Sequence, residues 1–481
     1  MSMKVAFLMV LFSIVGLVSS NDNCYPETVY MTLGEYYSPD YSEIGCTNTL
    51  QISFSTVNQC SDSYVIVFPE TNEEAELFET KNFFQQNAEP ILGVKQSVVE
   101  QSWNGEKFCH NGKNCEKVYY QKFVHYFTFD LCSFQKRFTY KIYGNINESP
   151  RVFTGIIPKR DRSSDEIQQF LAFGDHEISV PGNYTISSLS KLVEEKKEYD
   201  GILFLGDYAY EFYNNNATKG DIYMNSMEPF YSYWPYMFSP GNHEDCQNFA
   251  FVNQKFHMMN NISQQNNNVF SFNIGKVHFL SVNLHYFNNG TGVIDPQIQE
   301  SMLQSVEKDL IAANLNRKNQ PWIFILGHKP IYCVGRADCY DYYVQYQQFD
   351  QLFYKYGVDI FLAAHQHETT KYYPMYQNDT MPYQQFKQNI ILNPKSYMQI
   401  LQGNAGCDDM AHTDVYYNAT WVLSRSFDPG FGTLQIINDN LIQFLNYDSQ
   451  TNSSLEPTMI YSDHSYHIKN NTIDYGHYIN I

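Results

Sequence analysis

The sequence predicts two domains: an all-β sandwich followed by a larger α/β domain. Two observations predict this fold class. Between residues 28 and 144, short apolar runs follow the period of a strand and are bounded by polar turns. Beyond residue 166, apolar runs that end in polar residues alternate with stretches of helical period. A chain of 481 residues also exceeds the size of one ordinary core, so two domains are expected.

The N-terminal domain is expected to span residues 21–157. Its apolar runs are TVYMTL, LQISF, YVIVF, FVHYFTF and FTYKIYG. In the first run, alternation places Val29, Met31 and Leu33 on one face of a strand. A short piece near EEAELFE is the one helical pattern in this part. The charged segment PKRDRSSDE, which starts at Pro158, is interpreted as the linker.

The second domain is expected to span residues 166–481. Its strands are QQFLAFGD, GILFLGD, PWIFILGH and VDIFLAAH, and its helices include ISSLSKLVEEKKEY and a longer one that opens at Pro296. A further helical stretch lies between the last two of these strands. In α/β domains, functional groups gather at the carboxyl ends of the strands. The polar residues that end these runs are therefore the candidates for a site.

The N-terminus indicates secretion. Residues 1–20 carry one charge, an apolar run and then two serines, which is the layout of a signal peptide. The apolar run is short for a membrane-spanning helix. We therefore expect removal of the signal and no membrane partner afterwards, with secretion or delivery to a lysosome.

Cysteines and glycosylation motifs agree with an oxidising compartment. Six of the ten cysteines precede residue 133 and four follow it, and both even numbers fit disulfides that close within separate domains. Nine Asn-x-Ser/Thr motifs predict N-linked glycans on some surface loops. These motifs begin at Asn147, Asn183, Asn216, Asn261, Asn289, Asn378, Asn418, Asn452 and Asn470.

The charge argues against a nucleic-acid partner. The formal net charge is −20, and the only short basic run is Lys159, Arg160 and Arg162. Such a charge favours solubility. The composition does not indicate an oligomeric state, which stays open.

Groups with metal-ligand chemistry follow the strands of the second domain in order. Each has an ordinary alternative: an aspartate after a strand is most often a helix cap, and a lone histidine is usually structural. Histidines two residues apart in a strand share a face, so both can serve one metal site. The ordered set is what makes coincidence improbable: Asp175, Asp207 with Tyr210, Asn242 with His243, His328, and His365 with His367.

These motifs resemble the purple acid phosphatases among the calcineurin-like metallophosphoesterases, and most of all the animal-type branch. The resemblance covers nearly the whole chain after the signal. It implies a four-layer α/β sandwich of two mixed sheets flanked by helices, after a fibronectin-III-like β-domain. The matching motifs are GDHE at Gly174, GDYAY at Gly206, GNHE at Gly241, GHKP at Gly327 and AHQH at Ala364.

The resemblance also implies a dinuclear centre of Fe(III) and a divalent Zn, Fe or Mn ion. The implied ligands are Asp175, Tyr210 and His367 for iron, Asp207 as the bridge, and Asn242, His328 and His365 for the second metal. Hydroxide bound to the metals would attack a phosphate monoester, and His243 would bind the substrate and protonate the leaving group. The same site could serve a phosphodiesterase or nucleotide phosphatase, and a non-catalytic glycoprotein is the third hypothesis.

Three features of these motifs bear on the site: the first separates the purple acid phosphatases from most calcineurin-like enzymes, and the other two concern this sequence in particular. Most calcineurin-like enzymes have Asp-x-His at the first motif, whereas His176 directly follows Asp175 and is expected to point away, which leaves a ligand position for Tyr210. Glu177 replaces a common glycine. In IYCVGRADCYDYY, Arg336 or Tyr340 is a candidate to face substrate, and Cys333 with Cys339 could close the loop, although other pairings stay open.

Overall fold

The computed structural model describes most of both predicted domains. The signal peptide, four N-terminal cysteines, five of the nine glycosylation motifs, the EEAELFE piece and most of the linker lie outside the described residues. The described ranges are 24–34, 49–69, 91–92, 94–105, 118–131, 136–145, 149–158, 166–258, 266–288, 295–334, 339–381, 384–385, 389–409 and 420–464.

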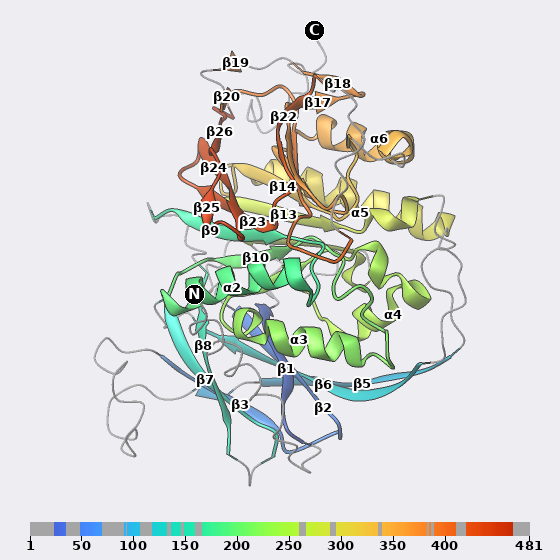
Figure 1. The fold of residues 1–481 in the computed structure, drawn as a ribbon, viewed down its shortest axis with the longest axis vertical. Coiled ribbons are helices and arrows are strands. Elements are labelled where there is room, and N and C mark those ends of the chain that lie inside the picture. Colours follow the sequence, from blue (N-terminus) through green and yellow to red (C-terminus); the bar gives the residue numbers. More distant parts are fainter. Residues whose placement is uncertain are drawn as a thin grey trace, which may run out of the picture.

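The N-terminal part contains two antiparallel sheets of four strands each, ordered β1-β2-β6-β5 and β4-β3-β7-β8 (Figure 1). The apolar runs named from the sequence all lie within these strands. The bounds are Glu27–Leu33 (β1), Thr49–Thr56 (β2), Tyr64–Pro69 (β3), Ile91–Leu92 (β4), Val94–Gly105 (β5), Val118–Asp130 (β6), Arg137–Tyr143 (β7) and Arg151–Ile156 (β8).

Strand β1 is buried on both faces, although its sequence alternation predicted one buried face. Val29, Met31 and Leu33 belong to the apolar core. The opposite face is also covered, because the Tyr30 hydroxyl donates to the carbonyl oxygen of Lys255 (2.9 Å). The second domain therefore packs on the outer face of this strand, which alternation alone does not reveal.

The first sheet of the second domain has nine strands, with the order β11-β10-β9-β23-β24-β26-β20-β19 and β25 paired to β24. Strands β9, β10 and β11 are parallel, so their carboxyl ends lie at one edge. The bounds are Gln168–Phe173 (β9), Gly201–Phe204 (β10), Tyr236–Phe238 (β11), Gln384–Gln385 (β19), Ile390–Leu392 (β20), Gly430–Ile436 (β23), Leu441–Asp448 (β24), Ser453–Ser454 (β25) and Thr458–Tyr461 (β26).

The second sheet has seven strands in the order β12-β13-β14-β15-β21-β16-β22, and β17 and β18 form a separate pair. Strands β13, β14, β15 and β21 are parallel neighbours. The bounds are Val269–Ile274 (β12), Val277–Val282 (β13), Trp322–Leu326 (β14), Ile360–Ala363 (β15), Thr369–Tyr372 (β16), Met375–Tyr376 (β17), Asp379–Thr380 (β18), Met398–Gln402 (β21) and Val422–Ser426 (β22).

Helices cover the two sheets, which pack on each other through aromatic side chains. Phe170 of the first sheet and Phe279 of the second have ring centres 5.1 Å apart. Helix α2 packs near β23, and α5 packs on β12 and β13 (Figure 1). The helices are Val180–Glu194 (α2), Thr218–Tyr231 (α3), Cys246–Lys255 (α4), Pro296–Leu315 (α5) and Cys339–Lys355 (α6), with short 3-10 turns at Asn242–Glu244 (η3), Asn266–Asn268 (η4) and Leu284–Phe287 (η5).

Local signals explain where two of these helices begin. The Asp295 carboxylate accepts hydrogen bonds from the amides of Gln297 and Ile298, and Pro296 occupies the first turn of α5. The Ser179 hydroxyl caps α2 by accepting from Gly182 N–H. Helix α2 thus starts before the apolar periodicity that predicted it, because its first turn is defined by a cap and a proline.

The cysteine prediction is correct in part. Cys24–Cys60 and Cys333–Cys339 are disulfides, each within one domain. Cys246 and Cys407 are buried thiols, so the expectation drawn from an even number of cysteines in the second domain was wrong for these two.

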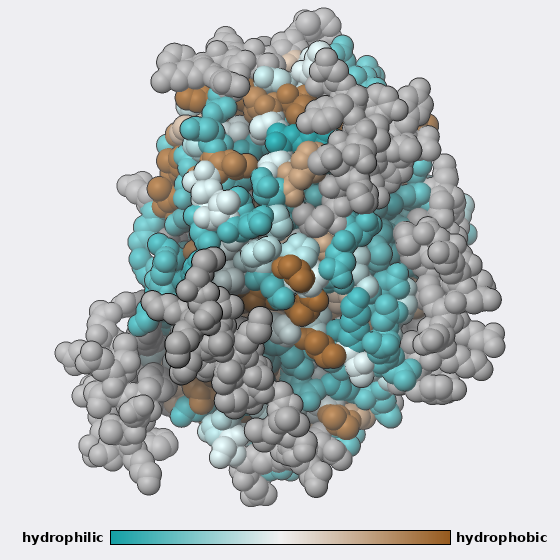
Figure 2. Space-filling view, in the orientation of Figure 1, coloured by the Kyte–Doolittle hydropathy of each residue, from teal (hydrophilic) through white to brown (hydrophobic). Residues whose placement is uncertain are grey.

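The described surface is consistent with a strongly charged chain. The face in Figure 2 is largely hydrophilic, with small separate apolar patches. The four glycosylation motifs within the described residues all begin with an exposed asparagine: Asn183, Asn216, Asn378 and Asn452. Among the helices of the described ranges, none has the length and apolar character needed to cross a bilayer.

Candidate metal centre

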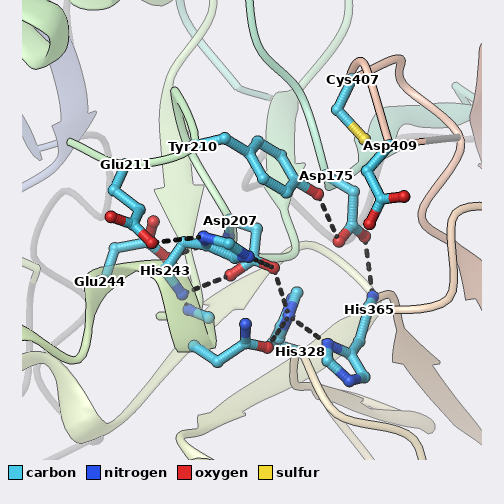
Figure 3. A network of polar contacts seen from close by, with 12 residues as sticks. Asp175, Asp207, Tyr210, Glu211, His243, Glu244, His328, His365, Cys407 and Asp409 are labelled. Carbon is cyan, nitrogen blue, oxygen red and sulfur yellow. Dashed lines mark hydrogen bonds and ion pairs between the residues drawn. The ribbon is translucent and has the colours of Figure 1, made fainter. Parts of the chain in front are cut away.

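The eight predicted site residues come together at the facing edges of the two sheets. Asp175 follows β9, Asp207 follows β10, and Asn242 follows β11. His328 follows β14 and His365 follows β15 on the other sheet. Parallel strands bring their carboxyl ends to one edge, so residues distant in the sequence converge between the sheets (Figure 3).

Asp175, Tyr210 and His367 form one half of the cluster. The Tyr210 hydroxyl donates to Asp175 Oδ1 at 3.0 Å and lies 3.0 Å from His367 Nε2. His367 Nε2 is 3.5 Å from the same Asp175 oxygen. The three predicted ligands of the first metal therefore point their donor atoms at one another.

Asp207, Asn242, His328 and His365 form the other half. His328 Nε2 lies 3.0 Å from Asp207 Oδ2, 3.1 Å from Asn242 Oδ1 and 3.2 Å from His365 Nδ1. The donor atoms of Asp207, His328 and His365 lie within 4.8 Å of one another, a spacing at which they could hold one ion.

The outward nitrogen of each candidate histidine ligand has an oxygen partner. His328 Nδ1 lies 2.7 Å from the carbonyl of Leu205, and His365 Nε2 lies 2.7 Å from the Tyr342 hydroxyl. His367 Nδ1 contacts the carbonyl of Asp409. Metal-binding histidines commonly bond their other ring nitrogen in this way, which fixes the tautomer and turns the free nitrogen to the metal. The residues present therefore fit a metal centre.

The electrostatics of the pocket favour positive charge. Burial raises the pKa of the Asp207 carboxyl, but His328 and His243 outweigh burial and hold that pKa well below its usual range. Burial lowers the pKa of His328, but the carboxylates of Asp207 and Asp175 outweigh it and raise that pKa. Burial and the two carboxylates raise the pKa of Tyr210, so only a strong cation would turn this phenol into a tyrosinate.

His243 lies beside the cluster and reaches solvent. Its backbone amide donates to Asp207 Oδ1 (2.9 Å), and its Nε2 is 3.9 Å from Asp207 Oδ2. On the other side, its Nδ1 is 3.4 Å from Glu211 Oε1 (Figure 3). Burial lowers the pKa of this imidazole, but the charges of Asp207 and Glu211 contribute to raising it to about 9. Such a pKa favours the protonated form of the ring at neutral pH.

His176 points away from the cluster, as its position next to Asp175 predicted. Its Nδ1 lies 3.1 Å from the Tyr223 hydroxyl, and its Nε2 lies 3.1 Å from the carbonyl of Gly182. Burial lowers the pKa of His176 to about 4, so this imidazole is neutral.

The backbone adopts a left-handed conformation at several candidate ligands. The φ angles are 57° at Asp175, 59° at Asp207, 37° at Tyr210 and 70° at His365. Non-glycine residues rarely adopt this conformation, and it persists where the surroundings impose it, often at functional sites. A Cβ atom on Gly241 would lie 2.2 Å from Asp207 Oδ1, so only glycine fits before Asn242.

The sequence analysis missed two residues that support the ligands. The Glu244 carboxylate accepts from the amides of Asp207 (2.9 Å), Tyr208 (2.8 Å) and Gly241 (2.7 Å). The sequence feature that could have indicated Glu244 is its position as the carboxylate of the GNHE motif. Tyr342, which contacts His365, lies two residues after the proposed Tyr340, whose side chain, like Arg336, lies outside the described residues.

Comparisons with known proteins show which family the second half of the structure is similar to. Residues 169–369 match the calcineurin-like phosphoesterase family. The matched range includes the eight candidate residues, and the family implies a dinuclear metal centre, so the resemblance drawn from the motifs is confirmed.

Relatives of the phosphoesterase domain include acid phosphatase type 7 of Danio rerio, 33% identical over 291 residues, and that of Homo sapiens, 32% identical over 262 residues. These alignments cover 56% and 50% of the chain and 62% and 56% of the relatives' own length, so the chain spans about six-tenths of the curated relatives it matches. A purple acid phosphatase from yellow lupin seeds shares the fold, with a TM-score of 0.65 at 15% identity over 91% of this chain and 74% of that one.

Proposed function

We propose that this protein is a dimetal acid phosphatase that hydrolyses phosphate monoesters. One observation carries the proposal: seven donor side chains from five strand ends meet in one buried cluster, and the outward nitrogen of each histidine in it is bonded to an oxygen. The similarity to acid phosphatase type 7 supports the same reaction class.

The proposed ligands divide by chemistry. Asp175, Tyr210 and His367 offer two anionic oxygens and one nitrogen, a set that suits Fe(III). Asn242, His328 and His365 offer neutral donors that suit a divalent Zn, Fe or Mn ion. Asp207 lies between the two sets and has two oxygens with which to bridge. When bound, the two ions would supply Lewis acidity and a nucleophilic water at low pH.

His243 is proposed to hold the phosphate ester and to donate a proton to the leaving oxygen. Its Nε2 faces the cluster, while Glu211 lies 3.4 Å from its Nδ1. Glu211 is in turn held by the Tyr213 hydroxyl, which donates to Oε2 at 2.7 Å. This arrangement orients the imidazole and stabilises its protonated form, which is the form that a proton donor needs.

The test compares two neighbouring tyrosines. Tyr210→Phe should remove any visible tyrosinate–iron absorption and lower the rate of aryl phosphate hydrolysis at acidic pH by about 100-fold or more, while the fold is kept. Tyr208→Phe is the control, because Tyr208 lies two residues before Tyr210 but is buried in the apolar core, where it stacks on Phe204 (4.4 Å between ring centres). Purified protein without metal and without activity, or a Tyr210→Phe spectrum equal to wild type, would contradict the proposal.

The alternative is a phosphodiesterase or nucleotide phosphatase on the same site. A bis-aryl phosphate and a nucleoside monophosphate, measured beside the aryl monoester, separate these activities. A diester kcat/KM above that of the monoester would favour the alternative. Metal content with no turnover of any of the three substrates would favour the non-catalytic glycoprotein.

Secretion or lysosomal delivery after removal of residues 1–20 is also proposed. The two disulfides support an oxidising compartment, and the exposure of four motif asparagines supports N-linked glycans. We further propose domain limits of 21–157 and 166–481. The strand orders β1-β2-β6-β5 and β4-β3-β7-β8 correspond to the A-B-E-D and C′-C-F-G orders of immunoglobulin-like sandwiches, whose architecture fibronectin-III domains share, and in this way they support the proposed fibronectin-III-like domain.

A further inference from the structure

Glu177, the last residue of the GDHE motif, connects two segments of the candidate centre. It follows β9 and is 9% exposed. One carboxylate oxygen, Oε1, accepts from the amide of Asp408 at 2.7 Å. The other, Oε2, lies 3.4 Å from the ammonium of Lys219. A glycine at this position could make neither contact.

On one side, the contacts lead to Tyr210. The Lys219 ammonium also donates to the carbonyl oxygen of Tyr210. Tyr210 has a φ angle of 37°, in the left-handed region that tyrosine rarely adopts. Such a conformation needs support from its surroundings. Lys219 supplies that support and is itself held by Glu177.

On the other side, the contacts lead to His367. Asp408 precedes Asp409, whose carbonyl is the partner of His367 Nδ1. The Cys407 sulfur of the same segment lies 3.3 Å from that nitrogen. Fixing the Asp408 amide therefore fixes the carbonyl that orients the His367 ring. The two sets of contacts end at neighbouring side chains, because the Tyr210 hydroxyl lies 3.0 Å from His367 Nε2.

We propose that Glu177 and Lys219 form a clasp that positions Tyr210 and His367 in the first half of the metal centre. Both are positioning residues, because neither contacts the reacting atoms. The inference rests on the proposed function for its metal but depends on a separate set of contacts. It assigns a role to Glu177, the residue of the GDHE motif that the proposed metal ligands leave without one.

An ordinary surface ion pair would not have this role. Exposed pairs contribute little to stability, and the Lys219 side chain is 34% exposed. The Glu177 carboxylate differs in that it is largely buried and each of its oxygens has a separate partner. The expected effect of losing it is therefore a misplaced ligand set in a folded protein.

The experiment uses three variants of the full chain. Glu177→Ala removes both contacts, Glu177→Gln keeps an acceptor for the Asp408 amide but loses the charge that holds Lys219, and Lys219→Met removes only the path to Tyr210. Glu194→Ala and Lys308→Met are matched controls, because both residues are exposed helix positions in the described chain. Iron and zinc content, the visible spectrum, kcat and KM are measured for the loaded proteins, and amide exchange at Asp408 for the metal-free proteins.

We expect Glu177→Ala and Lys219→Met to weaken iron binding about tenfold and to reduce the tyrosinate–iron absorption, with zinc retention unchanged and kcat affected more than KM. Amide exchange at Asp408 should accelerate at least tenfold in Glu177→Ala and stay near wild type in Glu177→Gln and Lys219→Met. A spectrum, iron affinity and Asp408 exchange all within twofold of wild type in Glu177→Ala would overturn the clasp. Because the exchange measurement needs no metal, it tests the clasp even if the wild type fails the test of the proposed function.

Discussion

At the scale of the residue, each imidazole of the centre has a different partner on its outer nitrogen. His328 and His367 contact backbone carbonyls, whereas His365 contacts the side chain of Tyr342. The ammonium of Lys329 lies 5.4 Å from the centre of the Tyr342 ring and adds a cation–π contact. A side-chain partner can be removed by substitution, so this histidine allows a direct test.

Tyr342→Phe should lower the affinity of the second metal about tenfold, because His365 loses the hydroxyl that fixes its tautomer and ring orientation. Tyr346→Phe, one turn along α6, is the control. The measurement is metal retention during dialysis against a chelator, with each metal followed separately. If Tyr342→Phe retained each metal as well as Tyr346→Phe does, Tyr342 would not be the residue that orients His365.

The positions of the candidate ligands could be predicted from the sequence, but their supports could not. Asp175, Asp207 and His328 end apolar strands, and a strand end fixes a position in an α/β sheet. Tyr342 reaches His365 from helix α6. Glu177 contacts Asp408, which is more than 200 residues away in the sequence. Such contacts depend on tertiary packing, which the spacing of apolar residues along a single sequence does not reveal. The roles of the ligands themselves stay predictions.

At the scale of the element, the short strand β16 contains a buried lysine. Lys371 is 2% exposed, and its ammonium lies 3.5 Å from the carbonyl of Phe444 and 5.6 Å from the centre of that ring. Burial lowers the pKa of Lys371 from 10.5 to about 8. The charged form is thus disfavoured in the folded protein, which destabilises the strand at neutral pH.

Lys371→Met should raise the free energy of unfolding at pH 7 by about 3 kcal/mol, because a shift of this size in the pKa corresponds to about that energy. The folded pKa lies below the unfolded one, so the penalty is complete below pH 8 and disappears as the pH rises towards 10.5. Urea unfolding at pH 7 and pH 10 checks this, with Lys308→Met on exposed α5 as the control. A gain that is the same at both pH values would contradict the proposed cause.

The sequence predicted the elements that are short apolar runs with a polar end and missed those whose buried side carries polar residues. Strands β9, β10, β14 and β15 were found because each is a short apolar run with a polar end. Helix α3 was missed because it contains Gly220 and Pro229. Its buried side also includes Asp221 and Glu228, so the side that faces the core is not apolar in the sequence. Strands β23 and β24 near the C-terminus were also missed, although they contain 7 and 8 residues.

At the scale of the whole molecule, buried charges join the two predicted domains. Asp221 of α3 lies 2.8 Å from Lys122 of β6 and 3.3 Å from Lys255 of α4, and it accepts from the Tyr120 hydroxyl at 3.0 Å. Nearby, Glu228 of α3 pairs with Arg151 of β8. The side chain of Lys255 is completely buried, so Asp221 is the charge that compensates it at this interface.

Asp221→Asn should lower the free energy of unfolding by about 3–5 kcal/mol at pH 7, because it leaves buried Lys255 without its countercharge. Burial raises the pKa of Asp221, but Lys255 and Lys122 outweigh it and lower that pKa. The stabilisation is therefore present above pH 4 and is lost as the pH falls further. Denaturation at pH 7 and pH 3, with exposed Glu456→Gln as the control, measures it. If the variant lost the same free energy of unfolding at pH 3 as at pH 7, the cause would be altered packing and not the lost charge of Asp221.

The strand order of the first sheet has a consequence for biosynthesis. Strand β9, which places Asp175, lies between β10 and β23, and β23 begins only at Gly430. All seven candidate ligands precede Gly430 in the sequence. They are therefore synthesised before β23, the strand that pairs with β9 next to Asp175. Domains fold largely in the order of their synthesis, so the N-terminal sandwich can form early. The metal centre, in contrast, can be completed only after β23 has been synthesised and has paired with β9.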